Sequence, residues 1–77
     1  MSSNLNEVIL HLDETLDMET LHTLEDGVRK EAGVVAVGHN PDTAHMIMVV
    51  YDSETTRAAD LLHTFEERGL HAQVVGL

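Results

Sequence analysis

The sequence has 77 residues, the length of one small domain, and its 14 acidic and 4 basic residues give a formal net charge of −10. So acidic a surface argues against binding to nucleic acid or to an anionic membrane, because both need Lys and Arg to neutralise phosphates. Cysteine is absent, which excludes disulfides and thiolate ligands. No apolar run is long enough for a membrane span and the first residues do not resemble a signal peptide, so we expect a single cytoplasmic domain over residues 1–77.

The first half of the sequence predicts a strand followed by a helix. Apolar residues at alternate positions over residues 7–12 are typical of a strand with one buried face. Apolar residues at helical spacing follow over residues 18–32, with Asp17 at the expected N-cap and Gly33 directly after the end. Gly27 lies inside this helix, where glycine costs up to about 1 kcal/mol relative to Ala, and it therefore suggests close packing against another backbone.

The second half predicts a hairpin, a helix and a last strand. Residues 34–39 and 46–51 are rich in strand-forming residues, and the turn residues between them predict a hairpin with a loop of several residues. A one-sided helix follows from Ala58, with Gly69 as its stop, and residues 70–75 form a last strand. The order β-α-β-β-α-β predicts an α+β, ferredoxin-like fold: a four-stranded antiparallel sheet with two helices on one face.

Between Val8 and Val75, short motifs recur at the spacings of a known family. They are Leu24-Glu25, Gly33-Val34, Val37, Asn40, Tyr51-Asp52, Leu61-Leu62, Gly69-Leu70 and Ala72. In this pattern the sequence resembles the heavy-metal-associated domain of soluble copper chaperones and metal-transporting ATPases. The resemblance implies the ferredoxin-like fold and a role beside metal handling or redox-linked traffic.

The resemblance fails at the family's metal-binding loop. There the family has two cysteines in a CxxC motif, whereas this sequence has Asp17 and Thr20 at those positions. A carboxylate and a hydroxyl are hard ligands, which suit at most a weakly held, oxygen-liking cation, so the family's metal ligands do not transfer. With Asp13, Glu14 and Glu19 nearby, the loop is either a hard-cation site or patch for a basic partner, or an N-cap within a solvated helix start.

Met18 and His22 are a second candidate pair of metal ligands. They stand four residues apart on one helix face and offer a thioether and an imidazole to a soft ion. The alternative is that Met18 covers the edge of the core and that His22 pairs with Glu25 or Asp26.

His11 and His71 are a third candidate pair. In this topology the first and last strands are neighbours, and both histidines are expected on the open sheet face within one or two residue pairs of each other, together with Gln73. The alternative is a pair of solvated histidines.

The same alternation of residues predicts an apolar patch on the open sheet face. Its members are Ile9, Met46, Met48, Val50 and Val75. An exposed apolar patch commonly marks a surface for a protein partner or for a homodimer.

No nucleophile with a base and no paired carboxylates in a cleft can be identified, so an enzyme is not expected. The first hypothesis is a small binding protein of the heavy-metal-associated type, linked to transition-metal handling or transport, in which any metal ion is bound by His, Asp or Met. The alternative is a metal-free interaction or dimerisation module on the same scaffold.

Overall fold

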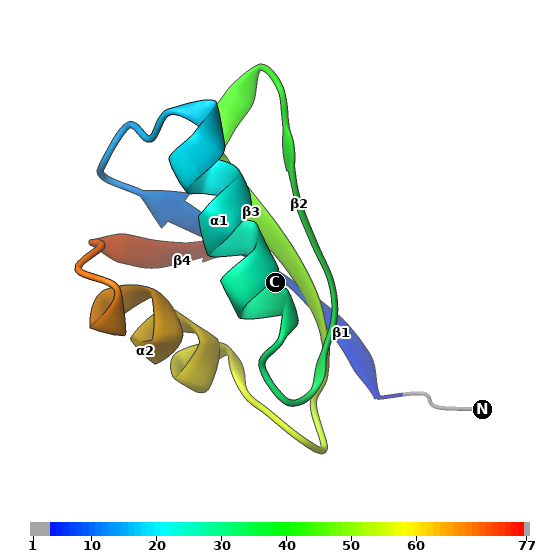
Figure 1. Cartoon of the computed structure of the whole chain (residues 1–77). Coiled ribbons are helices and arrows are strands. Elements are labelled where there is room, and N and C mark those ends of the chain that lie inside the picture. The colour runs from blue at the N-terminus through cyan, green and yellow to red at the C-terminus, as the bar shows by residue number, and fades with distance from the viewer. Residues whose placement is uncertain (1–3, 77) are drawn as a thin grey trace.

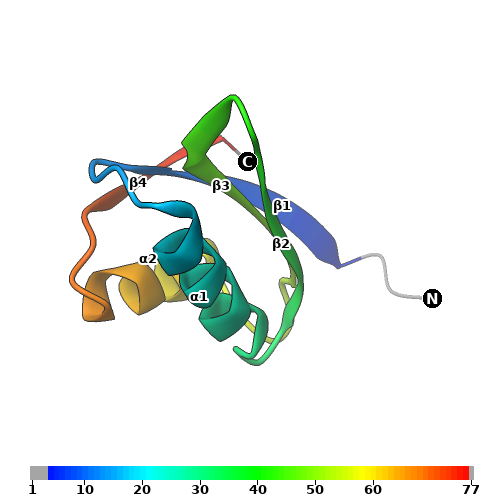
Figure 2. The ribbon, with the colours of Figure 1, turned by 45° about the horizontal axis from the view of Figure 1, so that its top comes forward.

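The computed structural model describes residues 4–76 and contains six elements in the predicted order (Figure 1). They are β1 (Leu5–Leu12), α1 (Met18–Arg29), β2 (Val34–Asn40), β3 (Thr43–Asp52), α2 (Ala58–Glu67) and β4 (Ala72–Gly76). The strands form one antiparallel sheet in the order β2-β3-β1-β4. Both helices cover the same face of this sheet, as Figure 2 shows from above. The predicted ferredoxin-like fold is therefore confirmed.

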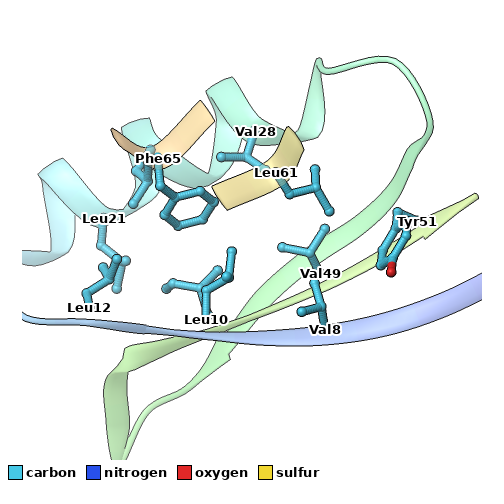
Figure 3. Packing of buried hydrophobic residues seen from close by; sticks show 11 residues of the cluster. Val8, Leu10, Leu12, Leu21, Val28, Val49, Tyr51, Leu61 and Phe65 are labelled. Carbon is cyan, nitrogen blue, oxygen red and sulfur yellow. The ribbon is translucent and has the colours of Figure 1, made fainter. Parts of the chain in front are cut away.

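The core lies between the sheet and the helices (Figure 3). Alternate residues of β1 and β3 point into it, because successive strand residues face opposite sides of a sheet. The helices contribute residues three or four apart, which share one helical face. The buried side chains are Val8, Leu10, Leu12, Leu21, Leu24, Val28, Ile47, Val49, Tyr51, Leu61 and Phe65. Burying each large apolar side chain contributes about 1.5–3 kcal/mol, and these contacts fix both helices on one face.

Several predicted boundaries differ from the observed ones. The hairpin between β2 and β3 has only Pro41 and Asp42 between its strands, so the expected loop of several residues is wrong. The side-chain oxygen of Asn40 accepts the Asp42 N–H at 2.9 Å and so stabilises this tight turn. Helix α1 ends at Arg29, earlier than predicted, and Gly33 then turns the chain with a φ of 88°.

Gly27 packs against a side chain and not against a backbone, which corrects the prediction. A Cβ atom at this position would overlap the guanidinium group of Arg68, which follows the last residue of α2. The glycine therefore makes room on α1 for the side chain of Arg68. None of the helices between residues 4 and 76 is long and apolar enough to cross a membrane.

Candidate functional site

The loop between β1 and α1 is organised by the N-cap of the helix. Asp17 Oδ1 accepts the backbone N–H of Thr20 at 2.7 Å, and the carbonyl of Asp17 accepts the N–H of Leu21 at 2.9 Å. The hydrogen bond from Thr20 lowers the pKa of Asp17, because it stabilises the charged carboxylate. The N-cap predicted at Asp17 is confirmed, and one carboxylate oxygen is engaged by the helix.

A second interaction fastens this loop to the segment before β4. The Glu14 carboxylate accepts the backbone N–H of His71 at 3.0 and 3.1 Å, and its Oε2 lies 2.6 Å from His71 Nδ1. The hydrogen bond with Glu14 raises the pKa of His71, and the same bond lowers the pKa of Glu14. The backbone N–H of Asp13 also donates to the carbonyl of His71 at 2.8 Å. The first loop is therefore tied to the start of the last strand.

His11 and His71 lie near each other in register, but their rings have different neighbours. His11 is paired with Gln73 across β1 and β4, and His71 lies two residues before Gln73. The ring of His71 is held by Glu14, whereas the ring of His11 meets that of His45 edge-to-face, with 4.9 Å between centroids and 82° between planes. His45 was missed because the sequence does not indicate how β3 approaches the end of β1.

Met18 and His22 are both exposed at the start of α1, and 54% of Met18 is accessible. Met18 therefore does not cover the edge of the core. His22 does not pair with Glu25, which binds His39 instead, nor with Asp26, which forms an ion pair with Arg29. The ring of His22 is instead close to that of His39, with 6.4 Å between centroids and a tilt of 41°.

Glu25 and His39 form a buried pair that sequence reasoning missed. His39 Nδ1 lies 2.7 Å from Glu25 Oε2, and only 11% and 7% of the two side chains are accessible. The periodicity of the sequence indicated that both residues face inward. Glu25 falls on the same helical stripe as Leu21 and Val28, and His39 stands two residues after the inward-facing Val37, on the same side of β2. The pair joins α1 to the edge strand β2.

The five residues considered as metal ligands are not gathered at one place. They are Asp17, His11, His71, Met18 and His22. Asp17, Met18 and His22 lie at the start of α1, whereas His11 contacts His45 and His71 is bound to Glu14. Across the described range, 4–76, no three or more His, Cys, Asp or Glu side chains are arranged to hold a metal ion. In the first loop, the carboxylates of Glu14 and Asp17 already take part in hydrogen bonds, and such hard oxygen donors do not fit the soft ions that thiolates bind.

The open sheet face carries the predicted apolar side chains. Met48 and Val75 are 41% and 50% accessible, whereas Ile9, Met46 and Val50 are partly buried. Ile9 lies directly opposite Met48 in the pairing of β1 with β3. These residues face away from the helices, since the alternate positions of the same strands supply the core.

A small pocket of about 130 Å³ lies beside the start of α1. It is lined by Leu16, Thr20, Thr23, Leu24, Arg68 and Leu70. No imidazole or carboxylate lines it, so it adds nothing to the candidate metal ligands.

Solved structures of metal-binding domains share this fold. Oxidised MerP from Ralstonia metallidurans superimposes with a TM-score of 0.79 at 20% identity, covering 91% of this chain and 96% of MerP. The copper form of CopA from Bacillus subtilis superimposes with a TM-score of 0.77 at 23% identity, and both chains are covered completely. The yeast copper transporter domain Ccc2a superimposes with a TM-score of 0.78 at 23% identity, and the match covers 91% of this chain and 94% of the domain. No model of a protein family and no curated protein matches the sequence.

Proposed function

With the fold of heavy-metal-associated domains as the premise, we propose that the chain binds a transition-metal ion through imidazole nitrogens and works beside metal handling or transport. The observation that carries the proposal is the pairing of imidazoles in a chain without cysteine: His11 with His45, and His22 with His39. Imidazole suits Zn(II), Cu(II) and Ni(II), whereas the thiolates of the family suit Cu(I).

Two further features support this function. CopA and Ccc2a, which have the same fold, are copper proteins, and Ccc2a is a domain of a copper transporter. The formal charge of −10 attracts cations to the surface and opposes nucleic acid and anionic lipid. We therefore propose that the chain works in the cytoplasm, where it receives a metal ion from a protein partner or delivers the ion to one.

Titration of the purified chain with Cu(I), Cu(II), Zn(II) and Ni(II) tests the proposal. We expect stoichiometric, submicromolar binding of at least one of the divalent ions, measured by calorimetry. His63→Ala is a suitable control, because His63 is exposed on α2 and its ring lies 3.7 Å from the Glu67 carboxylate, away from both histidine pairs. The absence of binding for all four ions would refute the function.

A second candidate function is a metal-free module that docks a partner or a second copy through the open sheet face. The specific observation is the accessibility of Met48 and Val75 on the face that no helix covers. We expect Met48→Glu to leave the fold intact and to dissociate an assembly in sedimentation. Met18→Glu is the matched control, because it adds the same charge at an exposed methionine on the helical side. If the wild-type chain is monomeric in sedimentation, docking of a second copy through this face is refuted.

A further inference from the structure

The buried pair between α1 and β2 leaves one imidazole nitrogen prepared for a metal ion. Glu25 Oε2 lies 2.7 Å from His39 Nδ1, and only 7% of the glutamate side chain is accessible. When the carboxylate is ionised, Nδ1 carries the proton and donates it in this hydrogen bond. In the neutral imidazole with its proton on Nδ1, the other nitrogen of His39, Nε2, holds a free lone pair, and the hydrogen bond to the carboxylate fixes the orientation of the ring.

This second nitrogen can be reached from solvent. In the part of the chain that the structure describes, every buried side-chain nitrogen and oxygen has a hydrogen-bond partner. His39 makes its hydrogen bond through Nδ1 alone within that part. Because Nε2 has no hydrogen-bond partner among residues 4–76, it is not completely buried, and 11% of the His39 side chain is accessible.

His22 supplies a second imidazole at this point. It is exposed on α1, one helical turn before Glu25, and its ring centroid lies 6.4 Å from that of His39. A metal ion about 2.0–2.1 Å from a coordinating imidazole nitrogen lies roughly 3.2 Å from the centroid of that ring. Two rings bound to one ion therefore have centroids roughly 6.4 Å apart when the ion and the centroids lie on a line, and about 5.2 Å apart when they form a tetrahedral angle. The observed separation equals the value for a linear arrangement, so a tetrahedral arrangement requires the ring of the exposed His22 to move about 1.2 Å closer to that of His39.

We propose that a divalent ion of the Zn(II), Cu(II) and Ni(II) class binds between His39 Nε2 and His22, with water completing the coordination and Glu25 acting as a positioning residue. This inference rests on the proposed metal-binding function and names its site. The His11–His45 pair fits less well. Its rings meet edge-to-face at 82°, so an edge points at a ring face, and between residues 4 and 76 neither ring forms a hydrogen bond or ion pair with a carboxylate. Carboxylates on ligating histidines typically contribute a factor of 10–100 to metal affinity.

Calorimetric titration with Zn(II) and histidine NMR spectra of the full chain test the site. We expect Zn(II) to shift the ring signals of His22 and His39, and we expect His22→Ala to weaken binding at least tenfold. Glu25→Gln keeps an acceptor for the His39 ring but removes the charge, and it should weaken binding by roughly 10–100-fold. His63→Ala should leave the affinity unchanged. Because His22 is exposed, its variant is expected to fold, and circular dichroism verifies this for each protein.

The outcomes separate the site from the function. If His11→Ala abolishes Zn(II) binding while His22→Ala preserves it, the proposed site is wrong and the metal-binding function stands. If Zn(II) binds without shifting the His22 and His39 signals, the site is also wrong. If neither Zn(II) nor any other ion of the series binds, the site and the proposed function fail together.

Discussion

Replacing His39 by Ala should be among the most destabilising single changes outside the apolar core. The substitution leaves the Glu25 carboxylate, 7% accessible, without its hydrogen-bond partner. A hydrogen bond to a charged group contributes about 1.5–3 kcal/mol, and breaking a fully buried ion pair costs about 3–5 kcal/mol. Because both side chains keep a little contact with water, we expect a loss of about 2–3 kcal/mol. At about 0.05–0.15 kcal/mol per residue the whole domain has a stability of roughly 4–12 kcal/mol, so this loss is a large fraction of the total.

Urea denaturation followed by circular dichroism measures this loss. For a domain this small we expect a slope of about 1 kcal/mol per molar urea, so the midpoint should fall by roughly 2–3 M. Adding Glu25→Leu to His39→Ala should recover about 1–2 kcal/mol, because the unpaired buried charge is then removed. A loss below about 0.5 kcal/mol, the size of an ordinary surface substitution, would refute the reasoning, as would a double variant no more stable than the single one.

Substitutions at three other positions test the ends of α1 and the loop before it. His71→Gln should lower the melting temperature most between pH 4.5 and pH 6.5, and a difference independent of pH would contradict this. The pKa of His71 is raised, so its contribution to stability is complete below pH 6.5 and is lost as the pH rises through the folded value. The pKa of Glu14 is lowered, so its contribution is complete above pH 4.5 and is lost as the pH falls. Gly27→Ala should stabilise the protein by about 0.5–1 kcal/mol in urea, because helix propensity improves and only the flexible end of Arg68 must move. Asp17→Ala should lower the melting temperature and Asp17→Ser should preserve most of it, since Ser also caps helices; equal losses would argue against the capping role.

The fold could be predicted because its signals are local. Alternation over residues 7–12 and helical spacing in residues 18–32 each determine which side of one element is buried, and the order of elements then leaves few topologies. The same alternation placed Met48 on the open face, where it is 41% accessible. The errors at element ends have local causes too: Asn40 closes a tight turn with its own side chain, which shortens the loop between β2 and β3.

The candidate site was less predictable because its contacts join residues far apart in sequence. Glu25 could have been recognised as buried from its position between Leu21 and Val28 on the apolar stripe of α1. His39 could not be recognised as the partner of Glu25, because the residue that faces Glu25 depends on the register of β2 and on where α1 crosses that strand. The neighbour of His22 was assigned within its own helix for the same reason, although the nearest ring belongs to His39.

The geometry of the first loop explains why a metal-binding role fits better between α1 and β2. A loop that captures and releases an ion must rearrange, whereas here Asp17 is hydrogen-bonded into the helix start and Glu14 is bound to both the backbone and the ring of His71. Loading Asp17 with a cation would compete with the cap that begins α1. Between α1 and β2 the situation differs: Glu25 and His39 are largely buried and hydrogen-bonded, His22 is exposed, and an ion placed between the two rings would leave the Glu25–His39 hydrogen bond in place. A hydrogen-bonded ligand beside an exposed one would provide both an oriented nitrogen and an open side for release, which the proposed exchange with a protein partner requires.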